Sequence, residues 1–124
     1  MSRFVVLIGE DIGPTNLARL QEAHPDLDFR FCPEPAAFVA NAADAEVIFS
    51  KQFPRTVLAN ASKLRWVQAG TAGVNHLLAA GLSDHDILLT NARGAHGVPM
   101  SEQILAMMFA FAILQPMEAG TYWL

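Results

Sequence analysis

Short apolar runs recur along the chain and alternate with segments of mixed polarity. The first run, over residues 4–8, consists of β-branched, aromatic and leucine residues and stops at Gly9. Such a run is typical of a central parallel strand that is covered on both faces. Residues 27–32 instead alternate between apolar and polar side chains, which predicts a half-exposed strand near an edge of the sheet. Three further short strands are predicted over residues 47–49, 65–68 and 87–90.

Helices are predicted between these strands. In the first, over residues 14–23, Leu17 and Leu20 stand at helical spacing and Pro14 suits a first turn. Others are predicted over residues 36–43, 55–61, 75–80 and 99–114. Strands that alternate with short helices favour an α/β fold with a doubly wound parallel sheet, and five strands favour the flavodoxin-like order 2-1-3-4-5. We therefore expect one domain over residues 1–98, and then a C-terminal helix that begins a segment over residues 99–124.

The last predicted helix is apolar on every face between residues 104 and 114. A helix of this kind is normally buried all round. This run of 11 apolar residues is shorter than the roughly 20 residues that a bilayer span needs, so we expect no membrane span. We expect residues 99–114 to pack against a second copy in a homodimer, or to swap between two copies.

Composition narrows the possible functions. The chain of 124 residues has room for one domain, 52% of its residues are hydrophobic, 16% are charged, and its formal net charge is -4. This charge disfavours nucleic acid as a partner, because few cations are available to neutralise phosphates. Cys32 is the only cysteine, which excludes a disulfide framework and disfavours a cysteine-based metal site. A cytoplasmic protein fits this best, and the first apolar run is too short for a signal peptide.

Chemistry in such folds is expected where the strands end, because ligands of parallel sheets bind beyond the carboxyl ends of the strands. The segments predicted to form this rim are residues 9–11, 50–51, 69–76 and 91–97. One loop on the rim is made of small residues: Gly70, Thr71, Ala72, Gly73, Val74 and Asn75. Glycines let the backbone approach a ligand, and amide N–H groups before a helix can point at an anion. The residues alone leave open an ordinary strand-to-helix turn, and they leave Lys51 open as an anion contact or a solvated side chain.

Three known protein classes with this architecture fit the rim poorly. A receiver domain needs an aspartate and a lysine where this chain has Ser50 and Asn91. A flavodoxin needs a phosphate-binding loop where the acidic pair Glu10 and Asp11 would repel phosphate. A dinucleotide-binding fold needs the G-x-G-x-x-G spacing, which occurs nowhere in the sequence.

Three ordered segments instead resemble the D-2-hydroxyacid dehydrogenases. Residues 64–77, LRWVQAGTAGVNHL, resemble the strand and carboxylate-binding loop of that family. Residues 87–94 continue the pattern, and residues 97–108, GVPMSEQILAMM, resemble the helix that joins its two domains. The resemblance covers roughly residues 1–112, and its specific part begins at residue 64.

The resemblance implies a substrate-binding domain. In that family, the amides of the loop matching residues 70–75 hold the carboxylate of a small 2-hydroxy or 2-oxo acid. Pro99 and Met100 would lie near the nicotinamide of NAD or NADP. Residues 99–124 would form the interdomain helix and the start of the following nucleotide-binding domain. The histidine, glutamate and arginine that complete the reaction, and the nucleotide-binding loop, belong to that domain and have no counterpart here.

We therefore assign no catalytic residue and no metal site to this chain. We expect the 124 residues alone to bind no cofactor and to turn over no substrate. The alternative is a non-catalytic α/β interaction module that docks through its apolar C-terminal helix.

Overall fold

The computed structural model describes the backbone of residues 3–118 and side chains as far as residue 114. The chain divides into two units, one ending at Arg93 and the other beginning at Gly94. The first unit contains the sheet, and the second contains helix α5 (Gly97–Glu118). The predicted domain boundary after residue 98 stays a prediction, and residues 119–124 of the predicted final segment lie outside the described residues.

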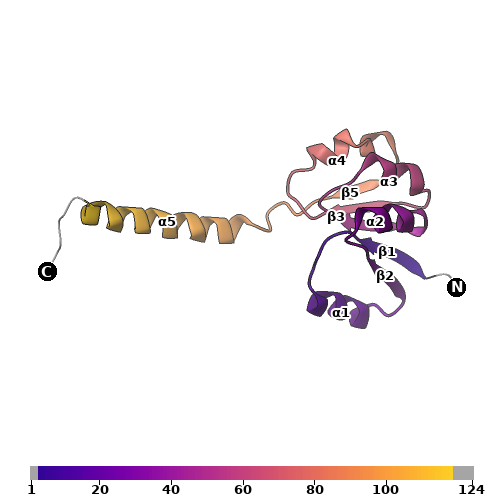
Figure 1. Ribbon diagram of the computed structural model, residues 1–124, viewed down its shortest axis with the longest axis horizontal. Helices are drawn as coiled ribbons and strands as arrows, with labels where there is room; N and C mark the ends of the chain where they lie inside the picture. The colour runs from indigo at the N-terminus through magenta and orange to yellow at the C-terminus, as the bar shows by residue number, and fades with distance from the viewer. Residues whose placement is uncertain (1–2, 119–124) are drawn as a thin grey trace. The chain divides into compact units, whose positions relative to one another are not determined.

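Five parallel strands form one sheet in the order β2-β1-β3-β4-β5 (Figure 1). Their bounds are β1 Phe4–Ile8, β2 Leu27–Phe31, β3 Val47–Ser50, β4 Trp66–Ala69 and β5 Leu88–Thr90. This order confirms the predicted α/β flavodoxin-like sheet. The alternating pattern predicted β2 as a strand near an edge, and it is an edge strand.

Short helices connect the strands. Their bounds are α1 Pro14–Ala23, α2 Pro35–Asn41, α3 Arg55–Asn60 and α4 Asn75–Ala79, with 3-10 turns η1 Ala42–Asp44 and η2 Leu82–Asp84. Each prediction lies within about two residues of these bounds, which is the usual uncertainty at helix ends. The last helix begins at Gly97, two residues before Pro99, and continues to Glu118.

The two faces of the sheet are covered differently. Right-handed crossover connections place α2, α3 and α4 over one face and α1 over the other, as Figure 1 shows. The first face is a closed core. Its most deeply buried side chains come from the sheet and from the helices above it: Leu7, Ile48, Val57, Val67 and Leu77.

Within the first unit the second face is only partly covered, which differs from the expectation for residues 4–8. Val6, Val47, Trp66 and Leu88 lie side by side across the sheet in register, and they line an open apolar hollow of about 820 Å³. Leu20 of α1 also lines this hollow. Strand β1 is therefore central in the sheet, but α1 covers only part of the second face around it.

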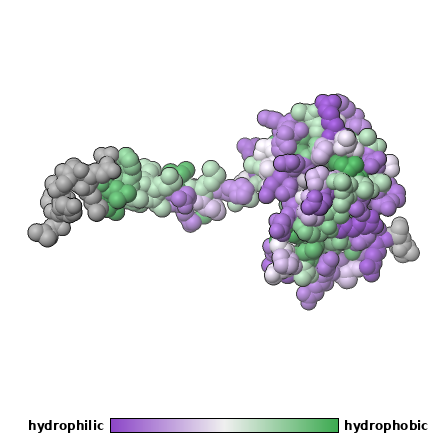
Figure 2. Space-filling model, in the orientation of Figure 1, coloured by the Kyte–Doolittle hydropathy of each residue, from purple (hydrophilic) through white to green (hydrophobic). Residues whose placement is uncertain are grey.

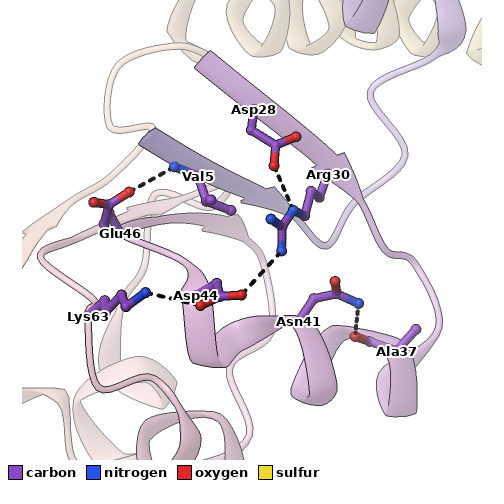
Figure 3. A network of polar contacts seen from close by, with 8 residues as sticks. All are labelled: Val5, Asp28, Arg30, Ala37, Asn41, Asp44, Glu46 and Lys63. Atoms are coloured by element: carbon purple, nitrogen blue, oxygen red, sulfur yellow. Dashed lines mark hydrogen bonds and ion pairs between the residues drawn. The ribbon is translucent and has the colours of Figure 1, made fainter. Parts of the chain in front are cut away.

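The amino edge of the sheet is held by a network of charged groups (Figure 3). The Glu46 carboxylate accepts a hydrogen bond from the amide of Val5 at 2.8 Å. Asp44 lies between two cations, with its oxygens 3.1 Å from Lys63 Nζ and 3.9 Å from an Arg30 nitrogen. These contacts join β2, η1 and the segment before β4 at the edge opposite the predicted site.

Helix α5 forms the second unit. Figure 2 shows polar residues gathered near its start and apolar residues along the rest of its described length. Among residues 3–118, one segment of 18 residues, Gly97–Leu114, is long and apolar enough to cross a membrane by length and composition. The expectation of no span, drawn from the 11-residue apolar run alone, is therefore not supported by length. One such helix is weak support for a span, because helices covered by protein have the same composition.

Candidate functional site

The loop over residues 70–74 leaves the carboxyl end of β4 and enters α4. At its start, the Gly70 amide donates to the carbonyl of Ser50 at 3.1 Å, which continues the pairing of β3 and β4. Gly70 thus belongs to the sheet edge, and the part of the loop that is free to contact a ligand begins at Thr71.

Three successive carbonyl groups of this loop, those of residues 71–73, accept hydrogen bonds from the protein. The Thr71 carbonyl accepts from the Ala92 amide at 3.1 Å, and the Ala72 carbonyl accepts from the Asn91 side chain at 2.8 Å. The Gly73 carbonyl accepts from the Thr71 hydroxyl, also at 2.8 Å. These hydrogen bonds to its carbonyl oxygens therefore hold the loop in place.

The amide N–H groups of the loop differ from its carbonyl groups in their hydrogen bonding. Among the hydrogen bonds formed within residues 3–118, none uses the amide N–H of Thr71, Ala72, Gly73 or Val74. Backbone N–H groups without protein acceptors are free to donate to an anion, as they do in the anion-binding turns of other proteins. The loop can therefore donate to a carboxylate without breaking any bond that holds it in place.

The two glycines of the loop, Gly70 and Gly73, lie in different surroundings. A β-carbon at Gly70 would lie 3.0 Å from Lys51 Cγ and 3.2 Å from Phe49 Cζ, so glycine is needed there for close packing. A β-carbon at Gly73 would have nothing within 4 Å, and its φ angle is not in the left-handed region. Neither packing nor backbone conformation therefore requires glycine at 73.

Lys51 lies beside this loop, with its aliphatic stem against Gly70. Its amide donates to Glu10 Oε1 at 2.9 Å, and its Nζ lies 3.8 Å from Glu10 Oε2. The Lys51 side chain is 56% exposed, so its charge remains accessible while Glu10 partly offsets it.

His76 also holds the backbone of Lys51 in place, through the Lys51 carbonyl. Its Nε2 lies 2.7 Å from the carbonyl of Lys51, and because a carbonyl can only accept, this nitrogen carries the proton. Glu10 and His76 stood on the predicted rim, yet the sequence assigned neither of them a role. The contacts that give them one join residues 41 and 25 positions apart.

The other residues singled out from the sequence lie in different places. Asn91 is structural, because its side chain donates to Ala72 and also accepts from the Arg93 amide at 3.3 Å. Pro99 and Met100 lie in the first turn of α5, in the second unit, and their place near a nicotinamide stays a prediction. Within residues 3–118, no three His, Cys, Asp or Glu side chains are grouped so that they could hold a metal ion.

The sequence was compared with models of known protein families. The model of the D-isomer specific 2-hydroxyacid dehydrogenase catalytic domain matches residues 6–104. The chain belongs to this family. The match confirms the resemblance drawn from residues 64–108 and places the 70–74 loop inside the matched region.

Two solved structures share the fold. A phosphoglycerate dehydrogenase from Lactobacillus plantarum matches 97% of this chain and 41% of its own, with a TM-score of 0.60 and 28% sequence identity. The PH0520 protein from Pyrococcus horikoshii OT3 matches 96% of this chain and 38% of its own, with a TM-score of 0.69 and 18% identity. The chain thus spans about two fifths of the length of either protein. Comparison with curated protein sequences finds no significant match.

Proposed function

We propose that the 70–75 loop binds the carboxylate of a small 2-hydroxy or 2-oxo acid, as the substrate-binding portion of an NAD- or NADP-dependent oxidoreductase. The observation that supports this proposal is that the carbonyl groups and the amide N–H groups of the loop are used differently. Its carbonyls are bonded to Asn91, Ala92 and Thr71, while the amides of residues 71–74 have no acceptor within the described chain. Such a loop is pre-organised for an anion, because binding requires little rearrangement.

Lys51 contributes the positive charge of this site. Its ammonium group is exposed and its backbone is fixed beside the loop by Glu10 and His76. A cation beside a row of amides favours an anionic substrate through both Coulomb attraction and hydrogen bonding. The similar Lactobacillus plantarum protein is a phosphoglycerate dehydrogenase, whose name refers to an acid of this chemical class.

Hydride transfer needs more than this loop. The hydride donor and acceptor carbons must be held nearly in contact, and a proton must be moved at the substrate oxygen. We assign no catalytic residue to the chain and expect its 124 residues alone to bind no NAD or NADP. In a longer protein, Pro99 and Met100 at the start of α5 would approach the nicotinamide. The purified chain should therefore show no glyoxylate-dependent oxidation of NADH or NADPH, and measurable turnover would contradict this part of the proposal.

Binding can be tested by NMR on the ¹⁵N-labelled chain. Glyoxylate or oxalate should shift the amide resonances of residues 71–75, whereas the neutral methyl ester of glyoxylate should not. Gly73→Ala adds a methyl group into open space and should weaken binding without unfolding the chain. Gly97→Ala is the matched control, because its β-carbon also has no neighbour within 4 Å and it lies in α5. Equal affinities for the two variants would contradict a site at the loop.

The apolar character of α5 supports a second proposal about partners. Its side chains from residue 98 to 114 are exposed in the second unit, including Phe109 and Phe111. We propose a cytoplasmic homodimer that uses residues 99–114, with neither nucleic acid nor membrane as a partner. The same observation favours, as a second candidate function, an interaction module that docks α5 on another protein.

A further inference from the structure

The charged residues at the carboxyl edge of the sheet are sorted by sign. The 70–74 loop follows β4, which lies between β3 and β5. Acidic residues follow β1 and β2 at the far side of β3, and cations follow β3 and β5, the two strands beside the loop. Within three residues of the strand ends, these are Glu10, Asp11 and Glu34 for the acids, and Lys51 and Arg93 for the cations. The loop therefore has a cation on either side, and the acids lie on the Lys51 side alone.

Hydrogen bonds fix the backbone of Arg93 beside the loop. Ala92, its neighbour in the chain, donates to the Thr71 carbonyl at 3.1 Å. The Arg93 amide donates to Asn91 Oδ1 at 3.3 Å, and the same asparagine donates to the Ala72 carbonyl at 2.8 Å. Arg93 is exposed, and among the described side chains it forms no ion pair. Its guanidinium group is therefore available to an anion that binds near the loop.

An open hollow of about 440 Å³ lies on the β5 side of the loop. It is lined by Val74, where the loop enters α4, and by Leu89, Thr90 and Asn91 at the end of β5. The Asn91 side chain in this lining is the one that accepts from the Arg93 amide. The hollow thus gives a ligand that is held by the loop amides room to extend toward Arg93.

The two cations lie too far apart to share one carboxylate easily. They follow strands that are separated by β4, and two strand spacings amount to about 10 Å. The Lys51 ammonium group also lies 3.8 Å from Glu10, on the side of β3 away from Arg93. A single carboxylate bound by the loop amides and Lys51 would therefore leave Arg93 without an anion. A second anionic group at the other end of the ligand would pair with it.

We propose that Arg93 selects 2-hydroxy or 2-oxo acids that have a second anionic group, either a carboxylate or a phosphate. The planar fork of a guanidinium group matches the oxygens of both. This inference rests on the proposed binding of the first carboxylate by the 70–75 loop, and it specifies the class of acid that the site prefers. Arg93 is then a specificity-determining residue of the first unit, and its role does not depend on where α5 lies.

Two matched pairs of acids test this preference by NMR titration of the ¹⁵N-labelled chain at low salt. The first pair is 2-oxoglutarate and 2-oxopentanoate, which differ in a terminal carboxylate. The second pair is 3-phosphoglycerate and glycerate, which differ in a phosphate. In at least one pair the acid with two anionic groups should bind about fivefold more tightly, which is the upper end for an exposed ion pair. The pair with the larger difference identifies the second group.

Substitution of Arg93 separates its charge from a structural effect. Arg93→Gln should remove the difference within the pair and leave the affinity for the acid with one anionic group unchanged, whereas Arg93→Lys should retain part of the difference. Arg3→Gln is the matched control, because Arg3 is also exposed but precedes β1 at the opposite edge. It should keep the full difference.

The titrations distinguish a failure of this inference from a failure of the carboxylate site. Equal affinities within both pairs, or a difference that persists in Arg93→Gln, would overturn the role of Arg93 while the loop still binds a carboxylate. If none of the four acids shifts the amide resonances of residues 71–75, the carboxylate site itself is wrong, and the inference is overturned with it.

Discussion

The carboxylate of Glu10 contacts Lys51 at both ends, through the backbone amide at 2.9 Å and through Nζ at 3.8 Å. One residue therefore fixes the backbone of Lys51 and also offsets the charge of its side chain. These two effects oppose each other at a site for an anion, because the fixed position helps binding and the offset charge weakens it.

Glu10→Gln should separate the two effects. Glutamine keeps an acceptor for the Lys51 amide but removes the negative charge, so glyoxylate should bind about two to five times more tightly at low salt. Lys51→Met should weaken binding, and the difference between these variants should shrink as salt increases. NMR titration measures both affinities. If neither variant changes the affinity, Lys51 lies outside the site.

Asn91→Ala should loosen the loop. The variant removes the donor to the Ala72 carbonyl, which costs about 0.5–1.5 kcal/mol of stability and several-fold in glyoxylate affinity. Asn60→Ala is the control, because Asn60 makes a similar bond, to the Val39 carbonyl at 3.2 Å, away from the loop. Urea unfolding should give comparable losses for the two variants, while only Asn91→Ala weakens binding. An unchanged affinity in Asn91→Ala would show that the loop keeps its shape without this bond.

Gly9→Ala should destabilise the fold. A β-carbon there would lie 2.7 Å from Phe38 Cε2 and 3.1 Å from Ser50 Oγ, and Phe38 is the buried residue of α2. Overpacking of this kind costs about 1–3 kcal/mol. Thermal unfolding should show the loss in Gly9→Ala and no comparable loss in Gly73→Ala, whose added methyl meets open space. A stable Gly9→Ala chain would mean that Phe38 can shift at little cost.

The sheet could be predicted because each strand carries its own local signal. Residues 4–8 form an unbroken apolar run and residues 27–32 alternate, and these patterns identify an inner and an edge strand before any contact is known. The start of α5 was less visible. Proline suits any of the first positions of a helix, where the missing N–H has no partner to lose, so Pro99 could not show that the helix begins at Gly97.

The site was predictable only in part. The small residues of the 70–75 loop are visible in the sequence, but the contacts of Glu10, His76 and Asn91 join residues that the strand order brings together. The partial covering of the second face was not predictable either, because an apolar run has the same sequence pattern whether one or both faces of its strand are covered. Only the placement of α1 shows that, within residues 3–93, no helix covers β4 and β5 on this second face.

Thr90→Val should show whether the second face of the sheet, which carries the apolar hollow, is covered in solution. The variant keeps the shape of the side chain but leaves Trp66 Nε1 without an acceptor and Gln68 Oε1 without a donor. If the face is exposed, water replaces the hydroxyl and stability changes little. If a helix covers it, the unpaired groups cost about 1–3 kcal/mol. Because the face is open within the first unit, we expect a small loss at every protein concentration.

Thr71→Val is the matched control for that measurement. It makes the same substitution in a loop where the hydroxyl bonds the Gly73 carbonyl and is exposed to solvent. Its effect on the free energy of unfolding should be small and independent of protein concentration. Chemical unfolding followed by tryptophan fluorescence over a range of concentrations measures both variants. A Thr90→Val loss clearly larger than that of Thr71→Val would instead show that a protein element covers this face in solution.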